Sequence, residues 1–167
     1  TLALRSGNNA RLFRRHMRHF LRFLAIAAFA ATAAACDEKL SSVTGPTPNL
    51  EPTFASIQAN IFEAGDSSGR VPCTNCHTNV GRTPAGGLNL LHDAAYDQLV
   101  NRASGQRAGW SLVTPKNPNG SYLVEKLVVS PSAAITGLRM PRNGPPYLTD
   151  GQILVIKRWI ENGAPRN

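Results

Sequence analysis

Residues 72–79, Pro-Cys-Thr-Asn-Cys-His-Thr-Asn, constrain the fold of this chain more than any other stretch of its sequence. Cys73 and Cys76 lie three positions apart, and His77 follows the second cysteine directly. A C-x-x-C-H pattern is compatible with a thioredoxin-like dithiol, a structural zinc site or the covalent attachment of a c-type haem. These chemistries need different surroundings, so the rest of the sequence discriminates among them.

The dithiol and zinc interpretations fit the surroundings less well. A thioredoxin-like dithiol follows a strand in a βαβ unit, whereas the flanks here have the patterns of helices and loops. Structural zinc needs four ligands in a tetrahedron, and the only histidines and cysteines after residue 36 are Cys73, Cys76, His77 and His92. The neighbours Cys76 and His77 rarely reach one small ion together, and no second C-x-x-C follows. Both interpretations stay open as alternatives.

Covalent haem is the interpretation that uses all three residues. Cys73 and Cys76 would form thioethers to the two vinyl groups, because one helical turn spans the distance between them. His77 would then ligate the iron as the proximal ligand. We therefore predict one haem c as the cofactor, bound through Cys73, Cys76 and His77.

Met140 is the predicted sixth ligand of the iron. It is the only methionine after Met17, and it lies in the Gly- and Pro-rich stretch 137–148, where a loop can direct a side chain across a pocket. Histidine with methionine is typical of a low-spin electron carrier of relatively high potential. The alternatives are that Met140 fills the core and that His92 provides bis-histidine ligation.

Helical patterns account for most of the remaining chain after residue 52. A helix is predicted from Thr53, as its cap, to Gly65, with further helices in 91–100 and 119–129. The clearest helix begins at Thr149, which forms a capping box with Gln152, and ends at Gly163. No stretch alternates convincingly, so the predicted class is all-α, with four to five short helices and long loops. Such a domain buries little apolar surface by itself, and a bulky apolar cofactor would complete its core.

The basic charge of the chain is concentrated at its N-terminal end. The net charge is +8, but six of the arginines and none of the acidic residues precede Cys36, so the remainder is close to neutral. A phosphate-binding surface is therefore not supported, and we expect no nucleic-acid partner. Residues 17–35 instead have the basic start, the uncharged run and the small-residue end of a secretory signal peptide. The alternatives are an N-terminal membrane anchor and a buried helix.

Cys36 is predicted to carry a lipid. Ala-Ala-Ala-Cys at residues 33–36 resembles a bacterial lipoprotein box, and lipidation accounts for a third cysteine that would otherwise be a free thiol in an oxidising compartment. The alternative is ordinary signal-peptidase cleavage with Cys36 left free. The predicted organisation is thus an upstream extension (1–16), the signal peptide (17–35), a lipid-anchored flexible tether (36–52) and one folded domain (53–167). We expect an exported protein held by its lipid at a membrane, on the periplasmic or cell-surface side.

Seven pieces in a fixed order carry a family resemblance: IFEAG, CTNCH, GGLNL, AYDQLV, NPNGSYLVEKL, RMPRNGPPYLT and QILVIKRWIENGAP. Residues 54–164 resemble a class I mono-haem cytochrome c, especially the bacterial domains of membrane-associated and planctomycete type. The resemblance implies that the first and last helices cross near one haem edge and that Met140 completes the iron. Segment 91–118 is longer than in the smallest members, and we expect it to cover the haem or to form a partner surface.

Further residues are candidates for the surroundings of the haem. The expected lining, for which ordinary core packing is the alternative, consists of Leu88, Leu90, Leu123, Leu127, Tyr147, Ile153, Ile156 and Trp159. Candidates to meet the haem propionates, rather than to be simple surface residues, are Arg107, Trp110, Arg139 and Arg142.

The predicted function is electron transfer, without enzymatic activity or a small-molecule substrate. The sequence offers no His–carboxylate pair, no nucleophile with a base and no phosphate-binding loop. The expected partners are a redox donor and a redox acceptor at the membrane. Two alternatives are a haem subunit of a larger respiratory or photosynthetic complex, and a haem enzyme or gas sensor with an open sixth site.

Overall fold

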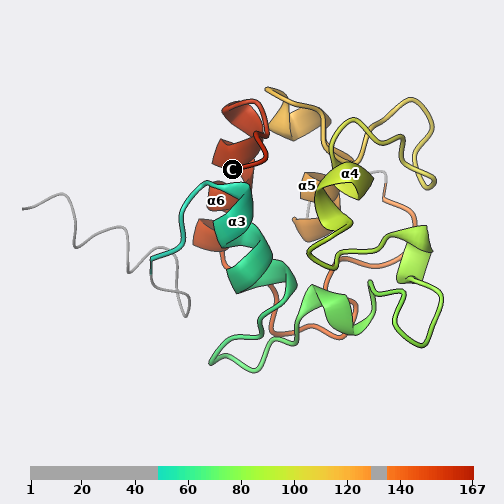
Figure 1. Cartoon of the computed structure of the whole chain (residues 1–167), viewed down its shortest axis with the longest axis vertical. Coiled ribbons are helices and arrows are strands. Elements are labelled where there is room, and N and C mark those ends of the chain that lie inside the picture. The colour runs from blue at the N-terminus through green and yellow to red at the C-terminus, as the bar shows by residue number, and fades with distance from the viewer. Residues whose placement is uncertain (1–48, 129–134) are drawn as a thin grey trace, which may run out of the picture. The chain divides into compact units, whose positions relative to one another are not determined.

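The structure, a computed structural model, describes residues 49–128 and 135–167. The predicted extension (1–16), the signal peptide (17–35), Cys36 and most of the tether therefore lie outside the described residues (Figure 1). Among the described residues, no helix combines the length and the apolar character needed to cross a membrane.

The described chain is mostly helical, which confirms the predicted all-α class. Figure 1 shows its four short α-helices, which are α3 (Phe54–Ile57), α4 (Ala95–Leu99), α5 (Tyr122–Leu127) and α6 (Asp150–Glu161). A π-helical turn, η2 (Gln58–Phe62), continues α3, and three 3₁₀ turns follow: η3 (Cys73–Asn75), η4 (Ala85–Gly87) and η5 (Pro118–Gly120). β-structure in the described ranges is limited to isolated bridges, such as that between Val100 and Val113.

The first helix begins where the sequence predicts and ends earlier. The Thr53 hydroxyl accepts a hydrogen bond from the Ser56 amide at 3.2 Å, which confirms the predicted cap. The helix passes into η2 and stops at Phe62, ahead of the predicted end at Gly65. Gly65 has a different role, because a Cβ there would lie 2.6 Å from the Arg70 carbonyl oxygen. The glycine thus permits a close approach between two backbone segments.

The middle helices are shorter than predicted. α4 starts at Ala95 because the preceding residues form a turn, in which the Ala94 and Ala95 amides both donate to the Leu91 carbonyl. α5 starts at Tyr122, inside the predicted range 119–129, and Ser121 precedes it without a side-chain cap hydrogen bond. Its buried face includes Leu123 and Leu127.

The last helix matches its prediction closely. Thr149 and Gln152 form the reciprocal capping box at the start of α6. Gly163 follows the helix with a φ of 99°, a left-handed conformation that favours glycine and ends helices. Ile153, Ile156 and Ile160 lie on the buried face of this helix.

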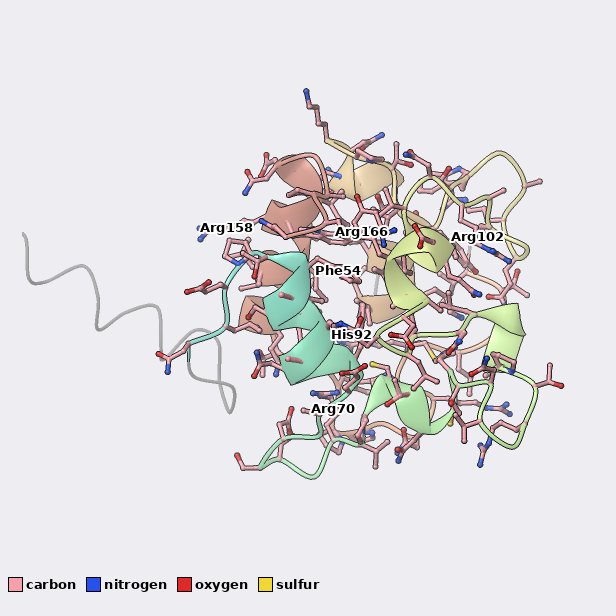
Figure 2. All side chains as sticks on the ribbon, viewed as in Figure 1. Phe54, Arg70, His92, Arg102, Arg158 and Arg166 are labelled. Carbon is pink, nitrogen blue, oxygen red and sulfur yellow. The ribbon has the colours of Figure 1, made fainter. Side chains whose placement is uncertain are left out.

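α3, α4 and the C-terminal end of the chain meet around aromatic rings. The Phe54 ring lies 5.1 Å from Tyr96 and 5.5 Å from Trp159, measured between ring centroids. Figure 2 shows Phe54 on the side of α3 that faces α4. The Ala55 amide also donates to the Asn167 carbonyl at 2.7 Å, which attaches the end of the chain to its first described helix. Leu50, inside the predicted tether, is buried in the same core, so the packed part begins ahead of Thr53.

Segment 91–118 packs on the start of α5. Its backbone pairs with itself between Asn101 and Val113. The carbonyls of Ser111 and Leu112 then accept hydrogen bonds from the Tyr122 and Leu123 amides. The segment therefore supports α5 directly.

Replacing Thr149 with alanine should remove the capping-box hydrogen bond that the Gln152 amide donates to the Thr149 hydroxyl at the start of α6. We expect the free energy of unfolding to fall by about 1 kcal/mol, the usual cost of losing a helix cap. Urea unfolding followed by circular dichroism measures this change. Ser67→Ala, at an exposed position, is the control, and an equal loss in both variants would contradict the capping assignment.

Candidate functional site

The C-x-x-C-H motif forms a single tight turn. η3 spans Cys73–Asn75, and the amides of Cys76 and His77 both donate to the Cys73 carbonyl, at 3.2 and 3.0 Å. Pro72 precedes the turn with an extended ψ of 146°, which suits the residue before a helical start. Cys73, Cys76 and His77 thus belong to one turn of the chain.

The segment around η4 holds the backbone and the ring of His77. The Leu90 amide donates to the His77 carbonyl at 2.9 Å, and the Ala85 amide donates to the Cys76 carbonyl at 3.0 Å. The His77 Nδ1 lies 3.3 Å from the Leu88 carbonyl oxygen. Because a carbonyl can only accept, this contact requires the proton on Nδ1 and leaves Nε2 as the ring nitrogen that can bind a metal.

His77 is kept in its neutral form. Burial lowers the pKa of His77 below its ordinary value, and this effect outweighs the carbonyls of Leu88 and Ala85, which raise it. A neutral imidazole is the form that ligates a metal. The protonation state of His77 therefore suits a ligand at neutral pH.

The two cysteines have different environments. Cys73 is half-buried and packs against the hydrophobic core, with its Sγ 3.5 Å from the Ile61 carbonyl oxygen. Burial raises the pKa of the Cys73 thiol to about 11. Cys76 is exposed, and neither cysteine is in a disulfide. The motif thus presents one inner and one outer free thiol.

A buried ion pair fixes the chain just before the motif. Arg70 is only 2% exposed, and its Nε donates to Asp66 at 2.9 Å. Its Nη1 and Nη2 donate to the carbonyls of Ile61 and Ala64, at 3.2 and 3.1 Å. Arg70 therefore satisfies carbonyls at the end of η2, including the Ile61 carbonyl that also contacts Cys73. Sequence reasoning did not select this pair, although opposite charges four residues apart were a visible signal.

Met140 belongs to a loop that is attached to α5. Its amide donates to the Lys126 carbonyl at 2.8 Å. The neighbouring Arg139 donates from Nε to the Leu127 carbonyl at 2.8 Å, and its guanidinium lies 4.1 Å from the centre of the Tyr147 ring. The Met140 side chain is half-buried and packs against the same core cluster as Cys73 and Leu88. Met140 and Cys73 thus both border the hydrophobic core of the domain.

The other candidates for the haem lining fall in different places. Leu88 and Leu90 lie beside His77, through the hydrogen bonds described above. Trp159 is fully buried at the contact with Phe54 and donates from Nε1 to the Pro165 carbonyl at 2.9 Å. Tyr147 is half-buried under Arg139. Leu88 and Leu90 are therefore lining candidates that contact the predicted proximal ligand through their backbones.

The alternative ligands and the propionate candidates also have defined positions. His92 is exposed. Across residues 49–128 and 135–167, no three His, Cys, Asp or Glu side chains are grouped so that they could hold a metal ion together.

Arg107 pairs with Glu125 and lies over the ring of Trp110, Arg139 contacts Tyr147, and Arg142 is exposed. Arg107 and Arg139 already have protein partners, so binding a propionate would require them to share or exchange those contacts.

Comparisons of the chain with protein-family models, with curated proteins and with solved structures gave no match.

Replacing Asp66 with asparagine should leave the Arg70 charge buried without its counter-ion. We expect a loss of about 3 kcal/mol in the free energy of unfolding, the usual cost of removing one partner of a buried pair. Asp97→Asn is the matched control, because Asp97 and Arg166 form an exposed pair, for which the expected loss is below about 1 kcal/mol. Equal losses in the two variants would contradict a special role for the buried pair.

Asp66→Asn should also change how the free energy of unfolding depends on pH in the acid range. Burial raises the pKa of Asp66, but hydrogen bonds from Ser68 and Arg70 outweigh it and hold the pKa below its ordinary value. A lowered pKa means that ionised Asp66 stabilises the fold above its unfolded pKa of about 3.9, and that this contribution is lost as the pH falls through the folded pKa. The stability difference between the wild type and Asp66→Asn should therefore shrink below about pH 4, measured by urea unfolding at a series of pH values.

Proposed function

We propose that this protein is an electron-transfer protein with one c-type haem, attached through Cys73 and Cys76 and ligated by His77 and Met140. The observation that supports the proposal is that residues from two distant segments border the same hydrophobic core. Cys73, from the C-x-x-C-H turn, and Met140, from the loop after α5, pack against one hydrophobic core together with Leu88. The Leu88 carbonyl in turn contacts the ring of His77.

The side chains at this place suit the chemistry of such a haem. Cys73 and Cys76 are free thiols on one turn, as thioether formation with two vinyl groups requires. The neutral ring of His77 has Nε2 as its metal-binding atom, and Met140 offers a thioether sulfur, which is a soft ligand suited to low-spin iron. When bound, the haem supplies a centre that exchanges one electron between Fe(II) and Fe(III).

The protein residues would set how that centre behaves. The Leu88 carbonyl would fix the orientation of the His77 ring and increase its basicity as a ligand. The hydrogen bonds from Ala85 and Leu90 to the motif would keep the turn in place in both oxidation states. Two protein ligands would leave no iron position for a substrate, which favours a carrier over an enzyme.

The rest of the sequence supports a location at a membrane surface. The proposed signal peptide would export the chain, and the lipid on Cys36 would hold it there. A tether of Ser, Thr and Pro residues would let the domain move between its partners. Those partners would be a redox donor and a redox acceptor on the periplasmic or cell-surface side.

Replacing Met140 with alanine should open the sixth coordination position of the iron. We expect the ferric protein to become high-spin, the reduction potential to fall, and the ferrous protein to bind carbon monoxide rapidly. Absorption spectroscopy, electron paramagnetic resonance and a redox titration measure these changes.

His92→Ala is the matched control for this experiment, because His92 is exposed and is the alternative ligand. It should keep the wild-type spectra and potential. Unchanged spectra in Met140→Ala, with altered spectra in His92→Ala, would contradict the assignment of Met140. Rapid carbon monoxide binding by the wild-type protein would favour a haem enzyme or gas sensor instead.

A further inference from the structure

Lys126 is a buried lysine on an otherwise apolar face of α5. The residue is 8% exposed and lies between Leu123 and Leu127, which are also buried. A buried lysine is rare and normally needs hydrogen-bond partners for its ammonium group. Its partners therefore indicate what it does.

Those partners lie on the loop that carries Met140. The Lys126 Nζ donates to the carbonyls of Thr136 and Leu138, at 3.0 and 2.8 Å. The Lys126 backbone carbonyl accepts from the Met140 amide at 2.8 Å. One residue of α5 thus holds the loop at Thr136, at Leu138 and at Met140 itself.

Neighbouring residues complete this attachment. The Leu127 carbonyl accepts from Arg139 Nε at 2.8 Å. The Tyr122 hydroxyl, one turn before Lys126 on the same helix, accepts from the Thr136 amide at 3.1 Å. The Thr136 hydroxyl donates to the Gln106 carbonyl at 3.0 Å, which links the loop to segment 91–118. That long segment therefore supports the loop of Met140.

We propose that Lys126 is the positioning residue for Met140: its ammonium group binds the carbonyls ahead of Met140 and so fixes where the methionine sulfur is presented to the iron. The inference rests on the proposed function, but the hydrogen bonds that carry it do not involve iron. Hydrogen bonds from a charged donor to carbonyls are stronger than those from a neutral donor. A lysine can therefore hold a loop whose own sequence, rich in Gly and Pro, forms no helix or strand.

The test compares two substitutions of Lys126. Lys126→Met keeps the length of the side chain but removes its hydrogen-bond donors and its charge, whereas Lys126→Arg keeps the donors and the charge. Lys157→Met on α6 is the control for the loss of one charge. Hydrogen exchange at the Met140 amide should quicken on the order of tenfold in Lys126→Met, as expected for the loss of hydrogen bonds to a charged group. In the same holoprotein we expect the methionine-to-iron charge-transfer band to weaken and the reduction potential to fall. Lys126→Arg should largely restore all three readouts, and Lys157→Met should leave them unchanged.

The outcomes separate this inference from the proposed function. A wild-type protein without methionine ligation would refute the His/Met assignment, whereas the exchange rate at Met140 tests the loop attachment independently of iron. Wild-type exchange and an intact charge-transfer band in folded Lys126→Met would overturn the inference. If Lys126→Met does not fold, Lys126→Gln serves as the test instead, because it keeps hydrogen-bond donors but removes the charge. It should show a smaller acceleration of exchange at the Met140 amide, and the wild-type exchange rate would overturn the inference.

Discussion

The buried pair of Asp66 and Arg70 is the interaction on which the rest of the described structure most depends. Helices as short as α3, with four residues, and α5, with six, are not stable in isolation. Arg70 binds the carbonyls that end the first helical segment, and Asp66 lies 3.5 Å from Gln152 Nε2 in the capping box of α6. The pair therefore joins the first helical segment, the last helix and the chain that enters the C-x-x-C-H turn.

The candidate site consists of two halves with different supports. The half that contains His77 is held by backbone hydrogen bonds from the segment around η4. The half that contains Met140 is held from α5, mainly through Lys126. Each half is fixed by contacts to protein rather than by contacts between the proposed ligands. Such preorganisation is what a carrier needs, because a site that moves little on oxidation exchanges electrons with little rearrangement.

The sequence predicts best the features that depend on neighbouring residues. Helix starts and stops follow from local hydrogen bonding and backbone preference. The structure confirms three of them: the cap at Thr53, the capping box of Thr149 and Gln152, and the stop at Gly163. The motif residues and Met140 could be selected because few cysteines, histidines and methionines are available after residue 36. Their roles as haem ligands stay predictions.

The features that sequence reasoning missed depend on contacts between distant segments. The π-helical turn after α3 coincides with Gln58, whose Nε2 donates to the Leu90 carbonyl at 2.9 Å. Lys126 has the spacing of an apolar position, and only the loop at 136–140 explains why a lysine is buried there. Leu50 looks like part of a tether because of its polar neighbours, but it is buried in the core. Such partners cannot be inferred from periodicity alone.

We propose that the turn from Cys73 to His77 carries a covalently attached haem. Mass spectrometry of protease fragments, from protein exported by a host that matures c-type cytochromes, tests it most directly. We expect a fragment that contains Cys73 and Cys76, with its mass increased by one haem and both thiols consumed. A fragment with two free thiols, an internal disulfide or bound zinc, and no haem, would contradict it.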